Sequence, residues 1–261
     1  MSESARLAVV TGASRGIGRE IAVTLARQGW DVAFSHLGDA AEATETTALI
    51  ATTGRKALGL RCDVGFKDEV WAFYQSVMTT FGRAPDLLVN NAGIQTWAPL
   101  LELAEADWDR VIRTNLKGCF LNTQRAAQLM VEHGIRGSIV NLGSACNKVA
   151  FPRLVDYTAS KGGIEQFTKV SATELGPYGI RVNCVAPGAI EHERTKLEAP
   201  DYADTWAAIT PLQRVGQTAD VAKVVHFLAT DAASFVTGQT IYVDGGAFTM
   251  PNWPYPQGKK G

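Results

Sequence analysis

The chain has 261 residues, of which 46% are hydrophobic, and its formal net charge is -1 at pH 7. This near-neutral balance, without a long run of like charges, disfavours binding to nucleic acid or to an acidic membrane surface and favours a small-molecule partner. The apolar run at residues 7–10 is too short for a signal sequence or a membrane span, so a cytoplasmic protein is expected.

Short runs of residues rich in β-branched side chains alternate with longer helical patterns along the chain. That alternation is typical of repeated β-α-β units and of a parallel sheet covered by helices on both faces. The predicted strands lie at residues 7–11, 31–35, 57–63, 86–90, 137–144, 180–185 and 240–243. Helices are predicted between them, for example at 17–28 and at 107–132, and the second is long enough to bend.

No linker or internal repeat divides this alternation, so residues 1–261 are predicted to form a single domain. Two segments depart from the pattern. Residues 191–210 follow a predicted strand end and are charged and helical in pattern, which leaves a mobile flap over a site and an ordinary surface helix as alternatives. Residues 251–261 are rich in proline, glycine and aromatic residues, and an unassisted tail of that composition is usually disordered.

The cysteines and histidines do not suggest a metal site. Neither residue type shows the spacing of a zinc site, and no pair of cysteines is spaced as in a C-x-x-C motif. The cysteines are Cys62, Cys119, Cys146 and Cys184. Reduced, mostly buried thiols and no bound metal are therefore expected.

A glycine-rich turn at residues 11–18, TGASRGIG, joins the first predicted strand directly to the first predicted helix. Glycine permits a tight turn and a close approach of the backbone to a pyrophosphate, whose charge a helix N-terminus stabilises. A dinucleotide is the expected ligand, because the strand before and the helix after distinguish this turn from an ordinary connection.

The choice of dinucleotide depends on the residue about twenty positions after the glycine turn, where a carboxylate often binds the ribose 2′-hydroxyl of NAD. His36 stands there, and its neighbours Ser35 and Leu37 are not acidic. Ser14 and Arg15 could bind the 2′-phosphate of NADP through charge-assisted hydrogen bonds. NADP is therefore the predicted preference, with NAD also accepted.

Four polar residues are candidates for proton transfer. Tyr157 and Lys161 are four positions apart at the start of a predicted helix, so they share one face of it. The nearby ammonium favours the phenolate and is expected to lower the pKa of the tyrosine, which makes the phenol useful as an acid and a base. Ser144 ends the preceding strand, where its hydroxyl could hold a substrate oxygen, and Asn115 could link the lysine to solvent through water.

In this order, these residues closely resemble the motifs of the short-chain dehydrogenases/reductases. The matching motifs are residues 11–18, Asp63-Val64, Asn90-Asn91-Ala92-Gly93, Asn115, Ser144, Tyr157 with Lys161, Pro187-Gly188 and Asp244-Gly245-Gly246. The resemblance implies one α/β domain with a Rossmann-type, doubly wound sheet of seven parallel strands, hydride transfer between a nicotinamide and a small alcohol or carbonyl substrate, and a homotetramer. It implies that the cofactor is bound by Gly12, Ser14, Arg15, Gly16, Ile17, Gly18, His36, Asp63, Val64, Asn91, Ala92, Gly93, Tyr157, Lys161, Pro187, Gly188 and Ile190.

Within the family, residues 132–246 and the C-terminal tail look most like bacterial glucose 1-dehydrogenases, in which the tail reaches an active site of the tetramer. This likeness implies that a sugar or polyol is the substrate and that it is contacted by Gln95, Cys146 and Glu191, although the residue types at these positions differ from those enzymes. Glu191 and His192 also replace a pair whose threonine contacts the nicotinamide amide, and Thr195 is a candidate substitute.

In the reductive direction, the resemblance implies that Ser144 and Tyr157 hold the carbonyl oxygen while Tyr157 supplies the proton, Lys161 binds the nicotinamide ribose and Asn115 relays the replacement proton. An apolar pocket is predicted from Trp97, Cys146, Leu154 and Trp206. Two alternatives to a sugar or polyol dehydrogenase stay open. One is a reductase of 3-oxoacyl thioesters or small ketones, and the other is a non-catalytic NADP sensor, which the complete set of candidate catalytic residues disfavours.

Overall fold

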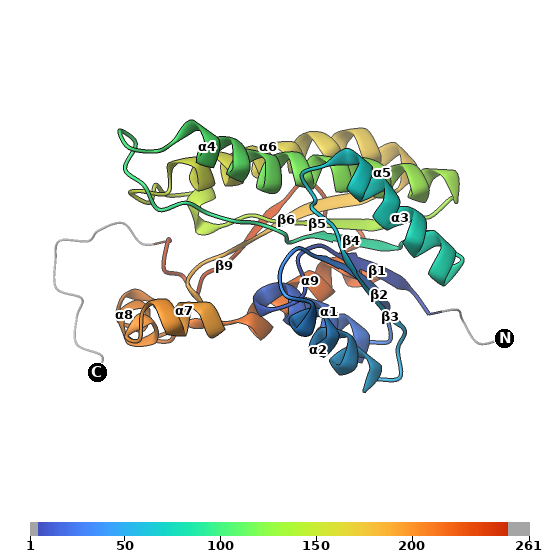
Figure 1. Ribbon diagram of the computed structural model, residues 1–261, viewed down its shortest axis with the longest axis horizontal. Coiled ribbons are helices and arrows are strands. Elements are labelled where there is room, and N and C mark those ends of the chain that lie inside the picture. Colours follow the sequence, from blue (N-terminus) through green and yellow to red (C-terminus); the bar gives the residue numbers. More distant parts are fainter. Residues whose placement is uncertain (1–4, 250–261) are drawn as a thin grey trace.

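The computed structural model describes residues 5–249, apart from the side chains of residues 194 and 198. The predicted tail at 251–261 lies outside the described residues. A parallel sheet of seven strands runs through the molecule in the order β3-β2-β1-β4-β5-β6-β9 (Figure 1). The strands are β1 (Leu7–Val10), β2 (Asp31–His36), β3 (Ala57–Arg61), β4 (Leu87–Asn90), β5 (Ser138–Leu142), β6 (Arg181–Pro187) and β9 (Thr240–Val243). All seven predicted strands are confirmed, each to within two residues at either end.

The central strands are buried on both faces, which explains why they are continuously apolar in sequence. In β1, Leu7 and Val9 belong to one hydrophobic core, whereas Ala8 and Val10 belong to a second core on the opposite face. Successive side chains of a strand point to opposite faces, so one short strand contributes to both cores. The predicted doubly wound α/β fold is therefore confirmed.

Two layers of helices cover the sheet (Figure 1). One layer holds α1 (Gly16–Arg27), α2 (Ala40–Ala51) and α9 (Thr218–Ala229). The other holds α3 (Lys67–Phe81), α4 (Glu105–Val111), α5 (Gly118–Glu132) and α6 (Val155–Leu175). Among the described residues, no helix is both long enough and apolar enough to cross a bilayer.

The predicted long helix at 107–132 is interrupted near its middle. Helices α4 and α5 are joined by a π-helical turn, Ile112–Lys117, that contains the candidate residue Asn115. Turns of this kind inside helices are frequent at functional sites, because the extra residue redirects side chains. The expected bend therefore has a specific cause and a specific position.

The segment predicted as a flap or a surface helix lies beyond the carboxyl end of β6. It contains α7 (Glu193–Glu198) and α8 (Tyr202–Ile209) and follows the short strand β7 (Ile190–Glu191), which pairs with β8 (Gly216–Gln217). In Figure 1, α7 and α8 stand apart from the two main helix layers. Strands β1 and β4 are neighbours although the chain order reverses between them, and ligands of open α/β sheets bind at such a reversal.

Candidate active site

A cleft of about 1300 Å³ runs along the carboxyl ends of the strands. It begins at the glycine turn after β1, passes the loops after β4 and β5 and ends beneath α7 and α8. The cleft thus joins the two sets of residues that the sequence singles out, the glycine turn and the polar group around Tyr157.

The glycine turn is held in shape by the loop that follows β4. The Asn91 side chain donates hydrogen bonds from Nδ2 to the carbonyl oxygens of Thr11 and Gly12, both at 2.9 Å. Gly12 has a φ of +67°, which favours glycine, and a Cβ atom at Gly18 would lie 2.3 Å from the Gly12 carbonyl oxygen. Both glycines are therefore required by the local geometry.

Helix α1 begins at the end of this turn, and no acidic residue in its first turn neutralises the partial positive charge of its N-terminus. Arg15 at the N-cap makes no side-chain capping hydrogen bond. The partial positive charge of the helix end therefore faces the cleft without a carboxylate from its own first turn. This arrangement suits the pyrophosphate of a dinucleotide.

Tyr157 and Lys161 lie in the first turns of α6 and line the cleft together with Ser144. The Lys161 Nζ atom lies 5.5 Å from the centroid of the Tyr157 ring and donates a 2.7 Å hydrogen bond to the Leu142 carbonyl oxygen. Ser144 follows β5 and caps a short helical turn, where its Oγ atom accepts a 3.3 Å hydrogen bond from the Cys146 amide. The loop after β5 and the start of α6 thereby bring the three side chains together.

The pKa values at this site depart from those of free side chains. Burial raises the pKa of Tyr157 to about 12, while a hydrogen bond with Ser144 lowers it and the nearby Cys146 thiol raises it. Burial lowers the pKa of Lys161. The expected net lowering of the Tyr157 pKa is wrong for this structure, because desolvation of the phenolate raises the pKa more than neighbouring groups lower it.

Asn115 is buried behind the cleft and does not line it. Its side chain accepts a 2.8 Å hydrogen bond from the Ile94 amide and donates one of 2.9 Å to the Ile94 carbonyl oxygen. It also donates a 3.0 Å hydrogen bond to the Ser160 hydroxyl of α6. These bonds connect the loop after β4 to the helix that carries Tyr157, so the side chain positions both.

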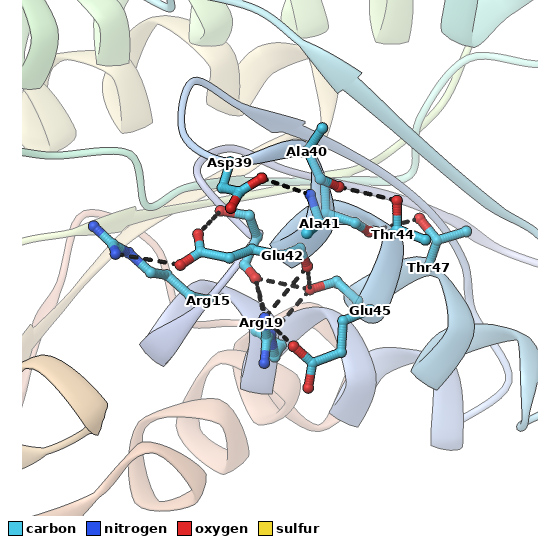
Figure 2. A network of polar contacts seen from close by, with 12 residues as sticks. Arg15, Arg19, Asp39, Ala40, Ala41, Glu42, Thr44, Glu45 and Thr47 are labelled. Carbon is cyan, nitrogen blue, oxygen red and sulfur yellow. Dashed lines mark hydrogen bonds and ion pairs between the residues drawn. The ribbon is translucent and has the colours of Figure 1, made fainter.

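The opposite end of the cleft contains a carboxylate that the sequence analysis missed (Figure 2). Glu42, in the first turn of α2, accepts a hydrogen bond from the Ser14 hydroxyl and pairs with Arg15, both at 3.3 Å. Nearby, the buried Nδ1 atom of His36 has no hydrogen-bond partner. Because this nitrogen is enclosed by the protein, it is not exposed to the cleft, although other atoms of His36 line it.

Nearly all the predicted site residues border this one cleft. The lining includes each of the predicted cofactor-binding residues, the predicted substrate residues Gln95 and Cys146, and the predicted apolar residues Trp97, Leu154 and Trp206. Glu191 is a correction, because it does not line the cleft and instead pairs with Lys196 at 3.3 Å. Thr195 borders the cleft, but its hydroxyl donates to the His192 carbonyl oxygen at 2.9 Å.

An aromatic wall that was not predicted from the sequence lines the cleft near Tyr157 and consists of Phe151, Tyr202, Trp206 and Phe248. The ring centroids of Phe151 and Phe248 are 5.5 Å apart, and those of Trp206 and Phe248 are 6.0 Å apart, both with edge-to-face geometry. Tyr202 and Trp206 are 6.2 Å apart. Tyr202 and Trp206 share helix α8, whereas Phe151 and Phe248 come from distant parts of the chain, so the sequence pointed only to Trp206.

The cleft fits a nicotinamide dinucleotide. The glycine turn leaves room that a Cβ atom would fill, and the first residues of α1 line the cleft. The residues that would hold the pyrophosphate are therefore those of the turn and of the first helical positions.

Comparison with known proteins agrees with this geometry. A family model described as enoyl-(acyl carrier protein) reductase matches residues 12–248. The 3-oxoacyl-(acyl-carrier-protein) reductase of Staphylococcus aureus is 42% identical over 241 residues, which cover 92% of this chain and 97% of that protein. The (3R)-3-hydroxyacyl-CoA dehydrogenase of Mus musculus is 41% identical over 249 residues, covering 93% and 96%. The crystal structure of acetoin dehydrogenase from Enterobacter cloacae has a TM-score of 0.89 at 35% identity, over 98% of this chain and 100% of that chain.

The names of these relatives concern 3-oxoacyl and 3-hydroxyacyl thioesters and acetoin, so they favour the alternative substrate class over the predicted sugar or polyol. The specific likeness to glucose 1-dehydrogenases is not shown by them. The match over most of the chain nevertheless shows the family and the reaction type. The chain belongs to the short-chain dehydrogenase/reductase family and is an NAD(P)-dependent oxidoreductase that acts on CH–OH or carbonyl groups.

Proposed function

We propose that the protein reduces the keto group of a 3-oxoacyl thioester with NADPH and, in reverse, oxidises the corresponding 3-hydroxyacyl thioester. The observation that carries this substrate class is the aromatic wall beside Ser144 and Tyr157, because an acyl chain requires an apolar surface to bury. A sugar would instead require several hydrogen-bonding side chains around its hydroxyls. The names of the bacterial and mouse relatives support the same class.

The polar residues of the site have distinct proposed roles. A nicotinamide dinucleotide bound in the cleft supplies the hydride that the carbonyl carbon accepts. Ser144 and Tyr157 hold the carbonyl oxygen, and the Tyr157 hydroxyl donates its proton to that oxygen, so the product leaves as a neutral alcohol. The protons and electrons balance, since the ketone gains one hydride and one proton.

Lys161 and Asn115 support the proton donor. The Lys161 ammonium lies beside the Tyr157 ring, where it would stabilise the phenolate left after proton transfer. With a dinucleotide bound, the same ammonium would also hold the ribose next to the nicotinamide. Asn115 fixes the loop after β4 against α6, and its proposed part in returning a proton to the phenol is to hold in place the groups along which water would carry that proton. Both roles concern orientation and charge, which are the contributions that a protein makes to cofactor chemistry.

We further propose that NADP is the preferred cofactor and that NAD is also accepted. Arg15 and Ser14 border the cleft near the end of β2, where a 2′-phosphate would be neutralised by the guanidinium and bonded by the hydroxyl. His36 stands where an NAD-specific carboxylate would otherwise lie.

The proposed substrate is tested by following NADPH absorbance against acetoacetyl-CoA, acetoin, glucose and gluconate. We expect the thioester to give the highest kcat/KM. A higher kcat/KM for glucose or gluconate would overturn the proposal in favour of a sugar dehydrogenase. Tight NADPH binding without turnover of any substrate would overturn it in favour of the sensor.

The cellular setting and assembly are also proposals. The four cysteines are free and buried, which suits a reducing cytoplasm. Phe120 on α5 and Val170 on α6 are 41% and 58% exposed, and apolar side chains exposed on neighbouring helices favour association into a homotetramer. Light scattering of the purified protein tests this assembly, and a monomeric mass would contradict it.

We propose that residues 191–210 act as a flap over the substrate end of the cleft. Side chains of α7 and α8 border the cleft, including Leu197, Tyr202 and Trp206. A flap should become less susceptible to proteases when NADPH and substrate are bound. Equal rates of cleavage in this segment with and without both ligands would identify an ordinary surface element.

A further inference from the structure

The first turn of α2 presents the Glu42 carboxylate to the residues that a 2′-phosphate would need. Its Oε2 atom accepts from the Ser14 hydroxyl, and its Oε1 atom pairs with Nη1 of Arg15, both at 3.3 Å. Figure 2 shows Arg15 extended toward the Glu42 carboxylate, with Arg19 of α1 beside Glu45, which lies one turn farther along α2. One carboxylate therefore engages both the cation and the hydroxyl at this end of the cleft.

The position of Glu42 is set by side chains of α1 and α2 that bond to the backbone of the glycine turn and of α2 and to each other. The buried Thr46 hydroxyl lies 3.0 Å from the Ser14 carbonyl oxygen and 3.1 Å from the Glu42 carbonyl oxygen. The guanidinium of Arg19 donates to the same Ser14 oxygen at 2.9 and 2.6 Å and pairs with Glu45 at 2.9 Å. The start of α2 is thus bound to the turn independently of the Glu42 side chain, which holds that carboxylate within reach of the cleft.

The location matches the ribose end of a dinucleotide. Ser14, Arg15 and Glu42 border the cleft together with the residues at the end of β2, including His36. Nucleotides in this type of fold place their adenosine ribose at the end of the second strand.

The two cofactors differ at one position of this ribose. NAD carries a 2′-hydroxyl, which can donate a hydrogen bond to a carboxylate, whereas NADP carries a 2′-phosphate with about two negative charges, as other phosphate monoesters do. A carboxylate already bonded to Ser14 and Arg15 competes with that phosphate for its partners and repels it. It has no such conflict with NAD.

Because of this competition, we propose that Glu42 weakens the binding of NADP relative to NAD and so limits the preference of the protein for NADP. The side chain occupies the partners of the 2′-phosphate in the absence of cofactor and must be displaced when NADP binds. The inference rests on the proposed function, because it concerns which nicotinamide dinucleotide enters the cleft. It accounts for the proposed acceptance of NAD by a site that contains Arg15 and Ser14.

The test compares Glu42→Gln with Glu20→Gln by calorimetric binding of adenosine 2′,5′-bisphosphate and of adenosine 5′-monophosphate. Glu20 is a matched control, since its side chain is 30% exposed against 29% for Glu42, lies on α1 and does not border the cleft. Glu42→Gln should tighten binding of the bisphosphate about tenfold, equivalent to about 1.4 kcal/mol. Binding of the monophosphate should change less than about twofold, and Glu20→Gln should change neither affinity.

The same variants are then assayed for kcat/KM with NADP and NAD. An increase in the NADP to NAD ratio for Glu42→Gln alone supports the proposal. Unchanged bisphosphate affinity in Glu42→Gln, or an equal gain in Glu20→Gln, overturns it. The nucleotide affinities are measured without turnover. If the protein reduces none of the substrates, the proposed function is refuted, and the binding measurements still decide the role of Glu42.

Discussion

The two ends of the cleft differ in how their polar side chains are brought together. At the Tyr157 end, two of the principal residues, Tyr157 and Lys161, lie within one helical turn of each other on α6. At the Glu42 end, the carboxylate comes from α2, while its partners Ser14 and Arg15 precede α1 in the chain. The first arrangement can be read from spacing along the sequence, and the second depends on how two helices pack.

This difference affects how a substitution at each end of the cleft should change the activity of the protein. The catalytic end depends on hydroxyl and amine groups whose replacement removes the chemistry itself. The adenosine end depends on competition between a protein carboxylate and a phosphate, so a change there should shift selectivity and leave the chemistry intact. The variants below separate these two behaviours.

The largest effect is expected at the catalytic end. Tyr157→Phe should lower kcat by roughly 10²–10⁴ while leaving NADPH affinity nearly unchanged, because it removes the proton donor and retains the ring. Stopped-flow fluorescence measures binding, and steady-state assays measure turnover. Tyr178→Phe is the control, since Tyr178 is exposed and does not border the cleft. Near-normal turnover in Tyr157→Phe would remove this residue from the mechanism.

A backbone change in the glycine turn should affect binding and stability together. Gly18→Ala places a Cβ atom 2.3 Å from the Gly12 carbonyl oxygen and 2.5 Å from Asn91 Nδ2, so the turn must open. Overpacking of this kind typically lowers the free energy of unfolding by about 1–3 kcal/mol. Urea denaturation and NADPH titration should both show the loss.

The matched control for this change is Gly162→Ala in α6. A Cβ atom there would meet no other atom within 4 Å, so stability should stay constant or rise by up to about 1 kcal/mol, because alanine favours helices. If Gly18→Ala is as stable as Gly162→Ala and binds NADPH normally, the close contact in the turn does not constrain the protein.

The pH dependence of ketone reduction distinguishes the lowered Tyr157 pKa expected from the sequence from the raised pKa in the structure. The reductive reaction requires a protonated Tyr157, and the pKa of about 12 keeps the phenol protonated throughout the neutral and mildly alkaline range. The kcat/KM for ketone reduction should therefore not fall as the pH rises from neutrality to about 10, the pKa of an ordinary tyrosine. A fall with a midpoint well below pH 10 that disappears in Tyr157→Phe would show that the working enzyme lowers this pKa, as the sequence predicted.

The smallest effect is expected at Glu191, a predicted substrate residue that the structure places outside the cleft. Glu191→Gln removes a partly exposed ion pair with Lys196 and alters a hydrogen bond from the Gln217 side chain, and exposed ion pairs contribute about 0–1 kcal/mol. Its kcat/KM should change by less than about fivefold. Ser144→Ala provides the contrast, with an expected loss of roughly 10²–10³ as for a donor to a developing oxyanion. A comparable loss in Glu191→Gln would restore it as a substrate contact.

Much of the fold and the cofactor cleft could be predicted because the relevant signals are local. A buried parallel strand is apolar along its length, and the glycine turn lies between a strand and a helix that are adjacent in sequence. The direction of the Tyr157 pKa shift could not be predicted in this way. It depends on how deeply the folded protein buries the phenol. The spacing between Tyr157 and Lys161 in the sequence does not reveal that burial.

By itself, the sequence determined the parallel sheet, the dinucleotide turn and the order of the polar residues on α6, because each follows from chain direction and helical or strand periodicity. Only the tertiary structure brought Glu42 to Ser14 and Arg15, assembled the aromatic wall and removed Glu191 from the cleft. These contacts join residues from separate elements, and their formation depends on how the helices and loops pack around the carboxyl edge of the sheet.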